Sequence, residues 1–174
     1  KKYTALHFGG NISLDRGVQS YLEFGNDNFQ GMGSSLSLSG RIGEKDKNGG
    51  LNFRIDRVFK TYFTAALHTY YDFKLNPFLV NLRKIGEYWE ERIGGKLIVG
   101  QQLRKLGQMN IELRIENVKD RRYSGEFIYS KNSELRTLGI RSVTDKRNKI
   151  AFPSQGIYNI WYWEAGNERI IGGQ

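Results

Sequence analysis

The sequence contains no cysteine, only two prolines and no long apolar run, and these absences exclude several kinds of structure. Without cysteine the chain forms no disulfide and no thiolate metal site. No apolar run approaches the about 20 residues that a transmembrane helix needs. The sequence also lacks the G-x-S-x-G motif of a nucleophile elbow, and residues 94–100 lack the spacing of a phosphate-binding loop. We therefore expect no enzymatic activity, no cofactor and no metal.

Glycine and aromatic residues are abundant instead. The 174 residues include 21 Gly, 10 Tyr, 10 Phe and 3 Trp, and aromatic residues make up 13% of the chain. Aromatic residues favour strands, and a disordered chain would contain few of them. This composition is typical of a β-rich protein.

Positive charge is spread along the chain, with a net charge of +9 and an isoelectric point near 9.7. Such a balance suits nucleic acid, anionic lipid or simple solubility. Nucleic-acid binding needs basic and stacking aromatic residues on one surface, whereas the basic clusters fall in several separate loops and turns. We expect contact with lipid phosphates and no nucleic-acid partner. The clusters are Arg83 and Lys84; Arg104 and Lys105; Lys119, Arg121 and Arg122; and Lys146, Arg147 and Lys149.

The dominant pattern is an alternation of apolar and polar residues with a period of two. In residues 109–117, four apolar side chains alternate with Asn110, Glu112, Arg114 and Glu116. Successive side chains of a strand point to opposite faces, so each such segment has one apolar and one polar face. Similar segments are 4–12, 17–25, 35–43, 51–56, 63–73 and 92–100, and an aromatic strand follows residue 156. The pattern predicts an antiparallel meander of about nine strands.

Turn-forming residues separate these segments. The expected turns are 14–17, 26–33, 44–50, 57–61, 103–108 and 145–156. The longest connections are expected at about 74–90 and 118–134, both after odd-numbered strands, whereas turns after even-numbered strands are expected to be mostly short. Glu90 and Glu91 would then be solvated loop residues. Outer-membrane barrels have this asymmetry, with strands of about 9–11 residues.

Two architectures give one apolar and one polar face on every strand. A soluble sandwich or lipocalin-like barrel turns the apolar face inward, whereas a transmembrane barrel turns it toward lipid. The transmembrane barrel is favoured because the apolar faces are nearly free of charge and the polar faces combine opposite charges. The expected pairs are Arg54 with Asp56 and Glu112 with Arg114, and His7 and His68 are expected to face the lumen.

Aromatic residues near strand ends also favour the membrane barrel. Tyr71, Trp161 and Trp163 are expected to form part of an aromatic girdle, because amphipathic rings prefer the boundary between lipid and water. Trp161 and Trp163 alternate with Tyr162, so both are expected on the lipid face together with Ile157.

Two motifs carry a resemblance to a known family. The first is an Asn-aromatic-x-Gly-x-Gly turn, and the second is Asp-x-Arg followed by Phe-Pro-x-x-Gly and an aromatic strand. Here they are Asn28, Phe29, Gly31 and Gly33, and Asp145, Arg147, Phe152, Pro153 and Gly156. In this order they resemble the bacterial surface antigen superfamily, which includes the barrel subunit of the outer-membrane assembly machinery, two-partner secretion transporters and patatin-like autotransporters. The family often has an acid directly after the arginine, where this chain has Asn148.

The resemblance implies a barrel of sixteen strands in the bacterial outer membrane. Residues 1–174 would be a single barrel domain, the N-terminal half of that barrel, without the upstream periplasmic domains and the C-terminal strands. The expected partners are outer-membrane lipid, the remaining strands or a second copy, and a passenger or substrate protein.

Residues 90–119 look most like the patatin-like autotransporters, in which any lipase activity belongs to an upstream domain. The resemblance therefore implies a transport or anchor domain. An insertase that folds other barrels is the first alternative, and a soluble β-barrel that binds an apolar ligand is the second.

Overall fold

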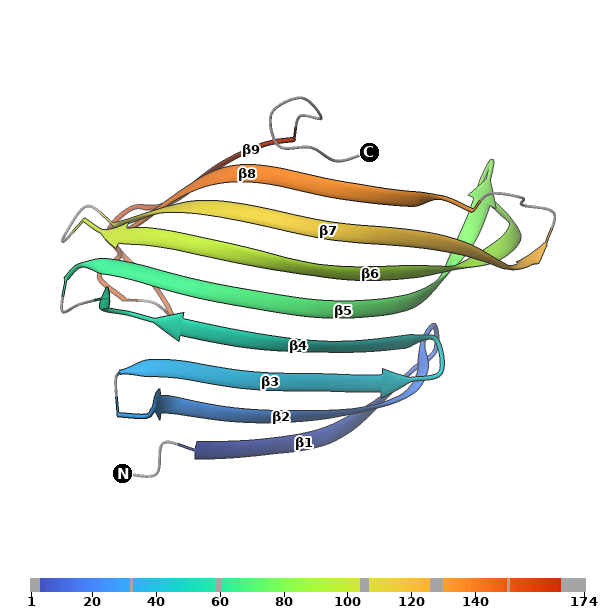
Figure 1. The fold of residues 1–174 in the computed structure, drawn as a ribbon, viewed down its shortest axis with the longest axis horizontal. Helices are drawn as coiled ribbons and strands as arrows, with labels where there is room; N and C mark the ends of the chain where they lie inside the picture. Colours follow the sequence, from blue (N-terminus) through green and yellow to red (C-terminus); the bar gives the residue numbers. More distant parts are fainter. Residues whose placement is uncertain are drawn as a thin grey trace.

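The computed structural model describes residues 4–31, 33–58, 61–103, 107–125, 130–149 and 151–166, which form one curved antiparallel sheet (Figure 1). Within these residues nine strands follow one another in chain order, and each pairs with the next. They are β1 (Thr4–Ser13), β2 (Gly17–Phe29), β3 (Ser34–Gly43), β4 (Asp46–Ile55), β5 (Phe63–Val80), β6 (Arg83–Gln102), β7 (Gln108–Gly125), β8 (Asn132–Asp145) and β9 (Tyr158–Ala165). The predicted all-β, up-and-down antiparallel architecture is confirmed.

The sheet has two open edges, formed by β1 and β9 (Figure 1). Each edge strand pairs on one side only, and β1 and β9 do not pair with each other in the described part of the chain. The same residues include no helix with the length and apolar character needed to cross a membrane.

The predicted long loops at 74–90 and 118–134 are wrong. β5 continues to Val80, Asn81 and Leu82 form a two-residue turn, and β6 starts at Arg83. Both turn residues have positive φ, 48° and 63°, which fits the tight turn that joins two strands of matching twist. β7 likewise continues to Gly125 and β8 starts at Asn132. The segments are strands because neighbouring strands supply their backbone hydrogen bonds: β5 and β6 pair with each other, and the end of β7 pairs with β6.

Pro77 lies inside a strand, although proline is usually a turn signal. Asn76-Pro77 is a strong turn signal, yet it lies within β5, opposite Glu87 and Tyr88 of β6. The N–H of Leu75 donates to the Lys45 carbonyl on the β4 side, at 2.7 Å. The nitrogen of Pro77 faces the same side two residues later, beyond the end of β4. Its missing N–H therefore removes no ladder bond.

Other strand ends also differ from the expected turns. β2 extends to Phe29, and β4 starts at Asp46, so the glycine-rich residues 48–50 are paired on both sides. The longest connection, residues 146–157, follows β8. The expectation of short turns after even-numbered strands is therefore wrong at β8. The asymmetry of the sheet comes instead from the long β5–β6 hairpin and β7, which extend past their neighbours at one end.

The burial pattern is the inverse of that in a soluble protein. No large apolar side chain of the described residues is buried. The buried side chains are polar or charged: Gln19, Ser34, Asp46, Thr64, Glu112, Glu116 and Thr137. Apolar residues cover one face of the sheet, which we call the outer face, and most of the polar residues lie on the opposite inner face. Water would not stabilise this arrangement, but hydrocarbon does.

The apolar band crosses the hydrogen-bonded rows obliquely. One row joins Ser20 of β2 to Lys119 of β7 through directly paired residues of the strands between them. In β2 the apolar residues Val18 and Leu22 lie on both sides of this row, whereas in β7 the apolar residues all precede it, ending at Ile115. A band parallel to a membrane shifts in this way when the strands are tilted, as they are in barrels.

Candidate functional site

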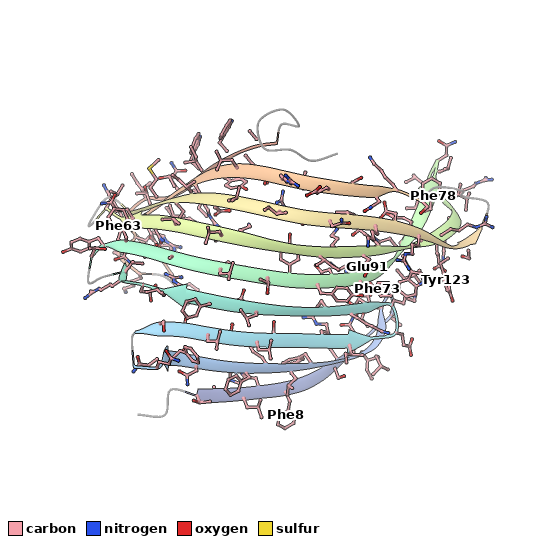
Figure 2. All side chains as sticks on the ribbon, viewed as in Figure 1. Phe8, Phe63, Phe73, Phe78, Glu91 and Tyr123 are labelled. Atoms are coloured by element: carbon pink, nitrogen blue, oxygen red, sulfur yellow. The ribbon has the colours of Figure 1, made fainter. Side chains whose placement is uncertain are left out.

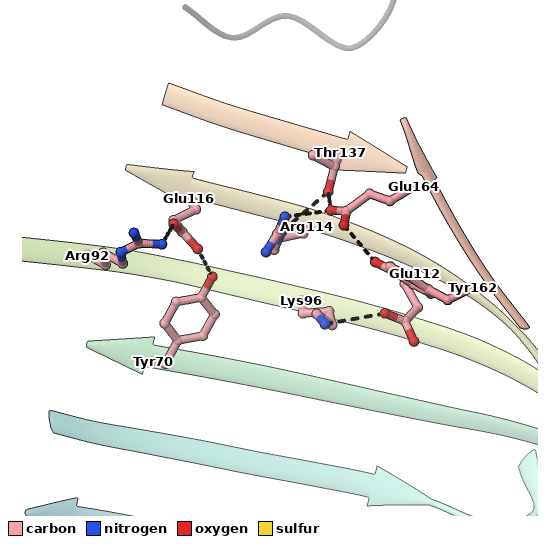
Figure 3. Close-up of polar contacts among 9 residues, drawn as sticks. All are labelled: Tyr70, Arg92, Lys96, Glu112, Arg114, Glu116, Thr137, Tyr162 and Glu164. Carbon is pink, nitrogen blue, oxygen red and sulfur yellow. Dashed lines mark hydrogen bonds and ion pairs between the residues drawn. The ribbon is translucent and has the colours of Figure 1, made fainter. Parts of the chain in front are cut away.

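The inner face carries an interlocked set of charges centred on β7 (Figure 3). Glu112 and Glu116 are 4% and 3% exposed, and Arg114 lies between them on the same face. These three side chains alternate with outward-facing apolar residues, which is why a period of two brings them together. β7 therefore presents a row of charges to the interior of the sheet's curve.

Each of these charges contacts a partner on another strand. Glu112 binds Lys96 of β6 at 3.3 Å, and Arg114 binds Glu164 of β9 at 2.6 Å. Glu116 accepts from Arg92 of β6 at 3.1 Å and also from a hydroxyl group of β5, that of Tyr70. The predicted pairing of Glu112 with Arg114 is therefore wrong, because each of the two side chains binds a partner on another strand instead.

Further hydroxyl groups complete the set. Glu164 also accepts hydrogen bonds from Tyr162, at 2.9 Å, and from Thr137. The Arg54–Asp56 pair is present at 2.6 Å, as predicted, and it is exposed. His7 and His68 lie on the inner face, as expected.

A hollow of about 530 Å³ lies over this inner face. Asn52, His68, Tyr70, Lys96 and Glu112 are among its lining residues. No group of three or more His, Cys, Asp or Glu side chains among the described residues is arranged to hold a metal ion. The wall of this hollow combines charged and polar side chains, including the Lys96–Glu112 pair, with apolar ones such as Ile98.

The Asn28 motif forms the turn between β2 and β3. Asn28 accepts two hydrogen bonds inside the turn: the Gly31 N–H donates to its carbonyl at 3.1 Å, and the Gly33 N–H donates to its Oδ1 at 2.9 Å. Gly31 and Gly33 have φ values of 73° and 67°, where side chains are disfavoured. Phe29 packs edge-on against Phe53 at 6.4 Å between ring centres. The motif therefore specifies turn geometry.

Asp145 and Arg147 open the long connection between β8 and β9. The Arg147 guanidinium donates to both carboxylate oxygens of Asp145, at 2.9 and 2.7 Å, and lies 4.3 Å from the ring centre of Tyr158. The hydrogen bonds to Asp145 raise the pKa of Arg147. The guanidinium thus fixes the end of β8 against the start of β9.

Asn148 closes the same connection. Its Oδ1 accepts from the backbone N–H groups of Ser154 and Gln155, at 3.2 and 3.3 Å, and its amide donates to the Ser154 hydroxyl at 2.8 Å. An acid at this position could accept the same two bonds. Gly156 has a φ of 115°, and a Cβ there would lie 2.2 Å from the carbonyl oxygen of Lys146. Phe152 and Pro153 lie exposed in this connection.

The predicted girdle residues all lie on the outer face. Tyr71 is 39% exposed and pairs with Ile93, while Trp161 and Trp163 are 54% and 49% exposed opposite Ser142 and Ile140. Trp161 and Trp163 therefore share the apolar face, away from Tyr162.

Sequence reasoning missed a second aromatic cluster. Phe73 stacks on Trp89 with 4.5 Å between ring centres, and Trp89 meets Tyr123 edge-on at 5.6 Å. Figure 2 shows Phe73, Glu91 and Tyr123 toward one end of the sheet and Phe63 at the other end. Trp89 and Tyr123 were assigned to loops, although the period of two continues through them.

The acidic and basic residues of these supposed loops also lie on strands. Glu90 and Glu91 belong to β6, where Glu90 binds Arg92 at 2.8 Å and Glu91 faces Arg121 at 3.7 Å. The prediction that they are solvated loop residues is therefore wrong. The 119–122 cluster is divided, because Lys119 and Arg121 pair with outer-face residues and Arg122 pairs with inner-face Tyr88. Arg83 and Lys84 begin β6, and Arg104 and Lys105 lie outside the described residues.

A family model described as the Omp85 superfamily domain matches residues 28–173. The chain belongs to the Omp85 superfamily. The crystal structure of BamA from Haemophilus ducreyi lacking POTRA domains 1–3 has a similar fold, with a TM-score of 0.74 and 18% sequence identity. The match covers 96% of this chain and 34% of the BamA chain, so the chain spans about a third of that structure. Comparison with curated proteins gives no match.

Membership of the Omp85 superfamily decides between the architectures left open by the sequence. The protein is a bacterial outer-membrane protein, and the sheet is part of an outer-membrane β-barrel. The exposed apolar face therefore meets lipid, and the soluble β-barrel with an apolar ligand is wrong. The Omp85 barrel is a transport and insertase fold, typically without enzymatic chemistry.

Proposed function

We propose that this Omp85 chain forms part of the barrel that anchors or exports a passenger protein, as in the patatin-like autotransporters. The polar inner wall carries the proposal. A wall that let an extended polypeptide pass should offer water-like contacts and no strong binding site. Here the buried carboxylates Glu112 and Glu116 are compensated by Lys96 and Arg92, so neither presents an uncompensated charge to a passing chain.

The remaining barrel wall is part of the same proposal. Unpaired N–H and C=O groups cannot remain in hydrocarbon, so β1 and β9 need partners. We infer that further strands of the same polypeptide complete the barrel to sixteen, with a second copy of the chain as the alternative. The resemblance of residues 90–119 to patatin-like autotransporters supports the passenger role.

Cross-linking in cells tests the passenger role directly. The sequence has no cysteine, so Ser39→Cys on the inner face introduces the only thiol of these 174 residues. A full-length protein whose natural upstream segment carries one cysteine should form a disulfide with this position during export. Leu38→Cys, one residue away on the outer face, is the matched control. Equal cross-linking at both positions, or none at Ser39→Cys, would contradict export through this barrel.

An insertase role is the second candidate, favoured by the fold shared with the BamA barrel. Its test is depletion of the full-length protein followed by measurement of other outer-membrane barrels. A general loss of those barrels would support the insertase, whereas loss of one exported passenger alone would support the proposal above.

A further inference from the structure

The outer face changes character abruptly along β6, β7 and β8. Ile93, Ile115 and Leu138 end the continuous apolar band of their strands on this face, toward the end that carries the β5–β6 hairpin. Beyond them the face carries charged side chains together with the aromatic rings of Trp89 and Tyr123. The charged residues are Glu91 of β6, Lys119 and Arg121 of β7, and Glu134 and Arg136 of β8, with Asn117 of β7 between them.

Arg121 is much more accessible than the acid that it faces. Arg121 is 67% exposed, whereas its partner Glu91 is only 19% exposed. Arg136 donates to Glu134 through Nε at 2.8 Å and Nη2 at 2.5 Å, and Glu134 precedes it on the strand. The Arg136 side chain therefore leaves the apolar band and extends toward the charged zone, as long basic side chains do at membrane boundaries.

Lys119 forms no ion pair within the described residues and lies directly opposite Glu91 and Asn132. It and Arg121 are two residues apart on the same face of β7, so their Cα atoms are about 7 Å apart. Arg136 of β8 lies opposite Ile115, four residues along the ladder from Asn132, the partner of Lys119. The three cations outnumber the acids Glu91 and Glu134, so this part of the outer face has an excess of positive charge.

The aromatic cluster places this charge at a definite depth. Phe73 and Trp89 stack beside Glu91, and Tyr123 continues the cluster past Arg121. Stacked Trp and Tyr rings mark the boundary between hydrocarbon and headgroups. The cations therefore lie at the level of lipid headgroups, directly above a surface that acyl chains cover.

We propose that Lys119, Arg121 and Arg136 form a binding site for the phosphate groups of membrane lipids. The apolar residues next to the site select a lipid over a free phosphate, because the acyl chains of the same molecule can contact Ile115 and Leu138. The acids Glu91 and Glu134 orient Arg121 and Arg136, and Arg121 stays 67% exposed toward the lipid. This site is independent of whatever passes along the inner face.

Native mass spectrometry of the full-length protein in detergent tests the site. The probes are phosphatidic acid, diacylglycerol with the same acyl chains, and inorganic phosphate. The variant is the triple substitution Lys119→Gln, Arg121→Gln, Arg136→Gln. The control removes three inner-face cations by Arg41→Gln, Arg54→Gln, Arg141→Gln, with the same change in net charge.

Phosphatidic acid should remain bound to the native protein and to the inner-face control, while diacylglycerol and inorganic phosphate should not. Affinity should fall roughly fivefold for each outer cation removed. If the triple variant does not fold, Lys119→Gln alone serves instead, because it breaks no ion pair of the described residues. It should lower the affinity for phosphatidic acid roughly fivefold. Equal retention of diacylglycerol, binding of inorganic phosphate alone, unchanged affinity in Lys119→Gln, or equal loss in the control would overturn the proposal.

Discussion

Leu38 and Ser39 are consecutive residues of β3 with opposite surroundings. Leu38 is 55% exposed on the outer face, and Ser39 lines the inner hollow. Replacing Leu38 by Arg places a charge in hydrocarbon and should lower the free energy of unfolding by about 2–4 kcal/mol. Ser39→Arg should cost less than about 1 kcal/mol, because the inner face is polar and wet. Urea titrations of the full-length protein in lipid vesicles measure both, and equal losses would refute the assignment of faces.

The aromatic ring of Tyr21 lies over Gly9. A Cβ at Gly9 would come within 2.6–2.8 Å of the Tyr21 ring and hydroxyl, from the directly paired residue of β2. Gly9→Ala should therefore destabilise the protein by about 1 kcal/mol, the lower end of the range for overpacking, because Tyr21 is partly exposed and can shift. In a Tyr21→Ala background the same change should be nearly neutral. A double-mutant cycle in unfolding free energy with no coupling would show that the ring does not lie there.

The faces of single residues were predictable, but their partners on other strands were not. Alternation alone placed Trp161 and Trp163 on the apolar face, because the strand period needs no knowledge of neighbouring strands. The pairing of Arg114 with Glu164 depends on two ladder registers, from β7 through β8 to β9. Nothing in the local sequence determines the sum of two registers, so the pair became visible only in the structure.

The connection between β8 and β9 depends on one amide side chain. Asn148→Ala removes the acceptor of the Ser154 and Gln155 N–H groups and should cost about 1 kcal/mol, since exposed turns let water replace part of each bond. Asn148→Asp keeps both acceptors and should cost clearly less. Thermal unfolding of the two variants compares them. If Asp and Ala were equally destabilising, the side-chain oxygen would not be what holds this turn.

Strand existence was predictable for this chain, whereas strand ends were not. The alternation of residues 63–73 predicted β5, but the predicted strand ended too early, because β5 continues through Asn76-Pro77 to Val80. Proline disrupts a strand only where its nitrogen faces a neighbouring strand that needs a hydrogen-bond donor. At Pro77 the neighbouring strand β4 has already ended. The glycines at 48–50 misled in the same way, because the sequence does not reveal that neighbouring strands pair on both sides.

The sheet as a whole exposes two unsatisfied edges. Within the described ranges, no strand pairs with β1 on the side away from β2, and none pairs with β9 on the side away from β8. Residues 1–174 expressed alone should therefore associate through these edges in detergent, because each unpaired group in an apolar medium costs free energy. Light scattering and amide exchange would measure this. A monodisperse monomer with protected amides on the free sides of both β1 and β9 would contradict it.

The contacts of β7 have a consequence for how this protein changes over generations. Leu113, on the outer face, touches lipid, and Ile or Val would serve there without any other substitution. Arg114 is bound to Glu164 on another strand, so a reversal of its sign requires a second, matched mutation. Lineages should therefore drift freely on the outer face while inner-face positions of β5, β6, β7 and β9 change together. Two homologues could then differ at most positions and still share the same charge pairs.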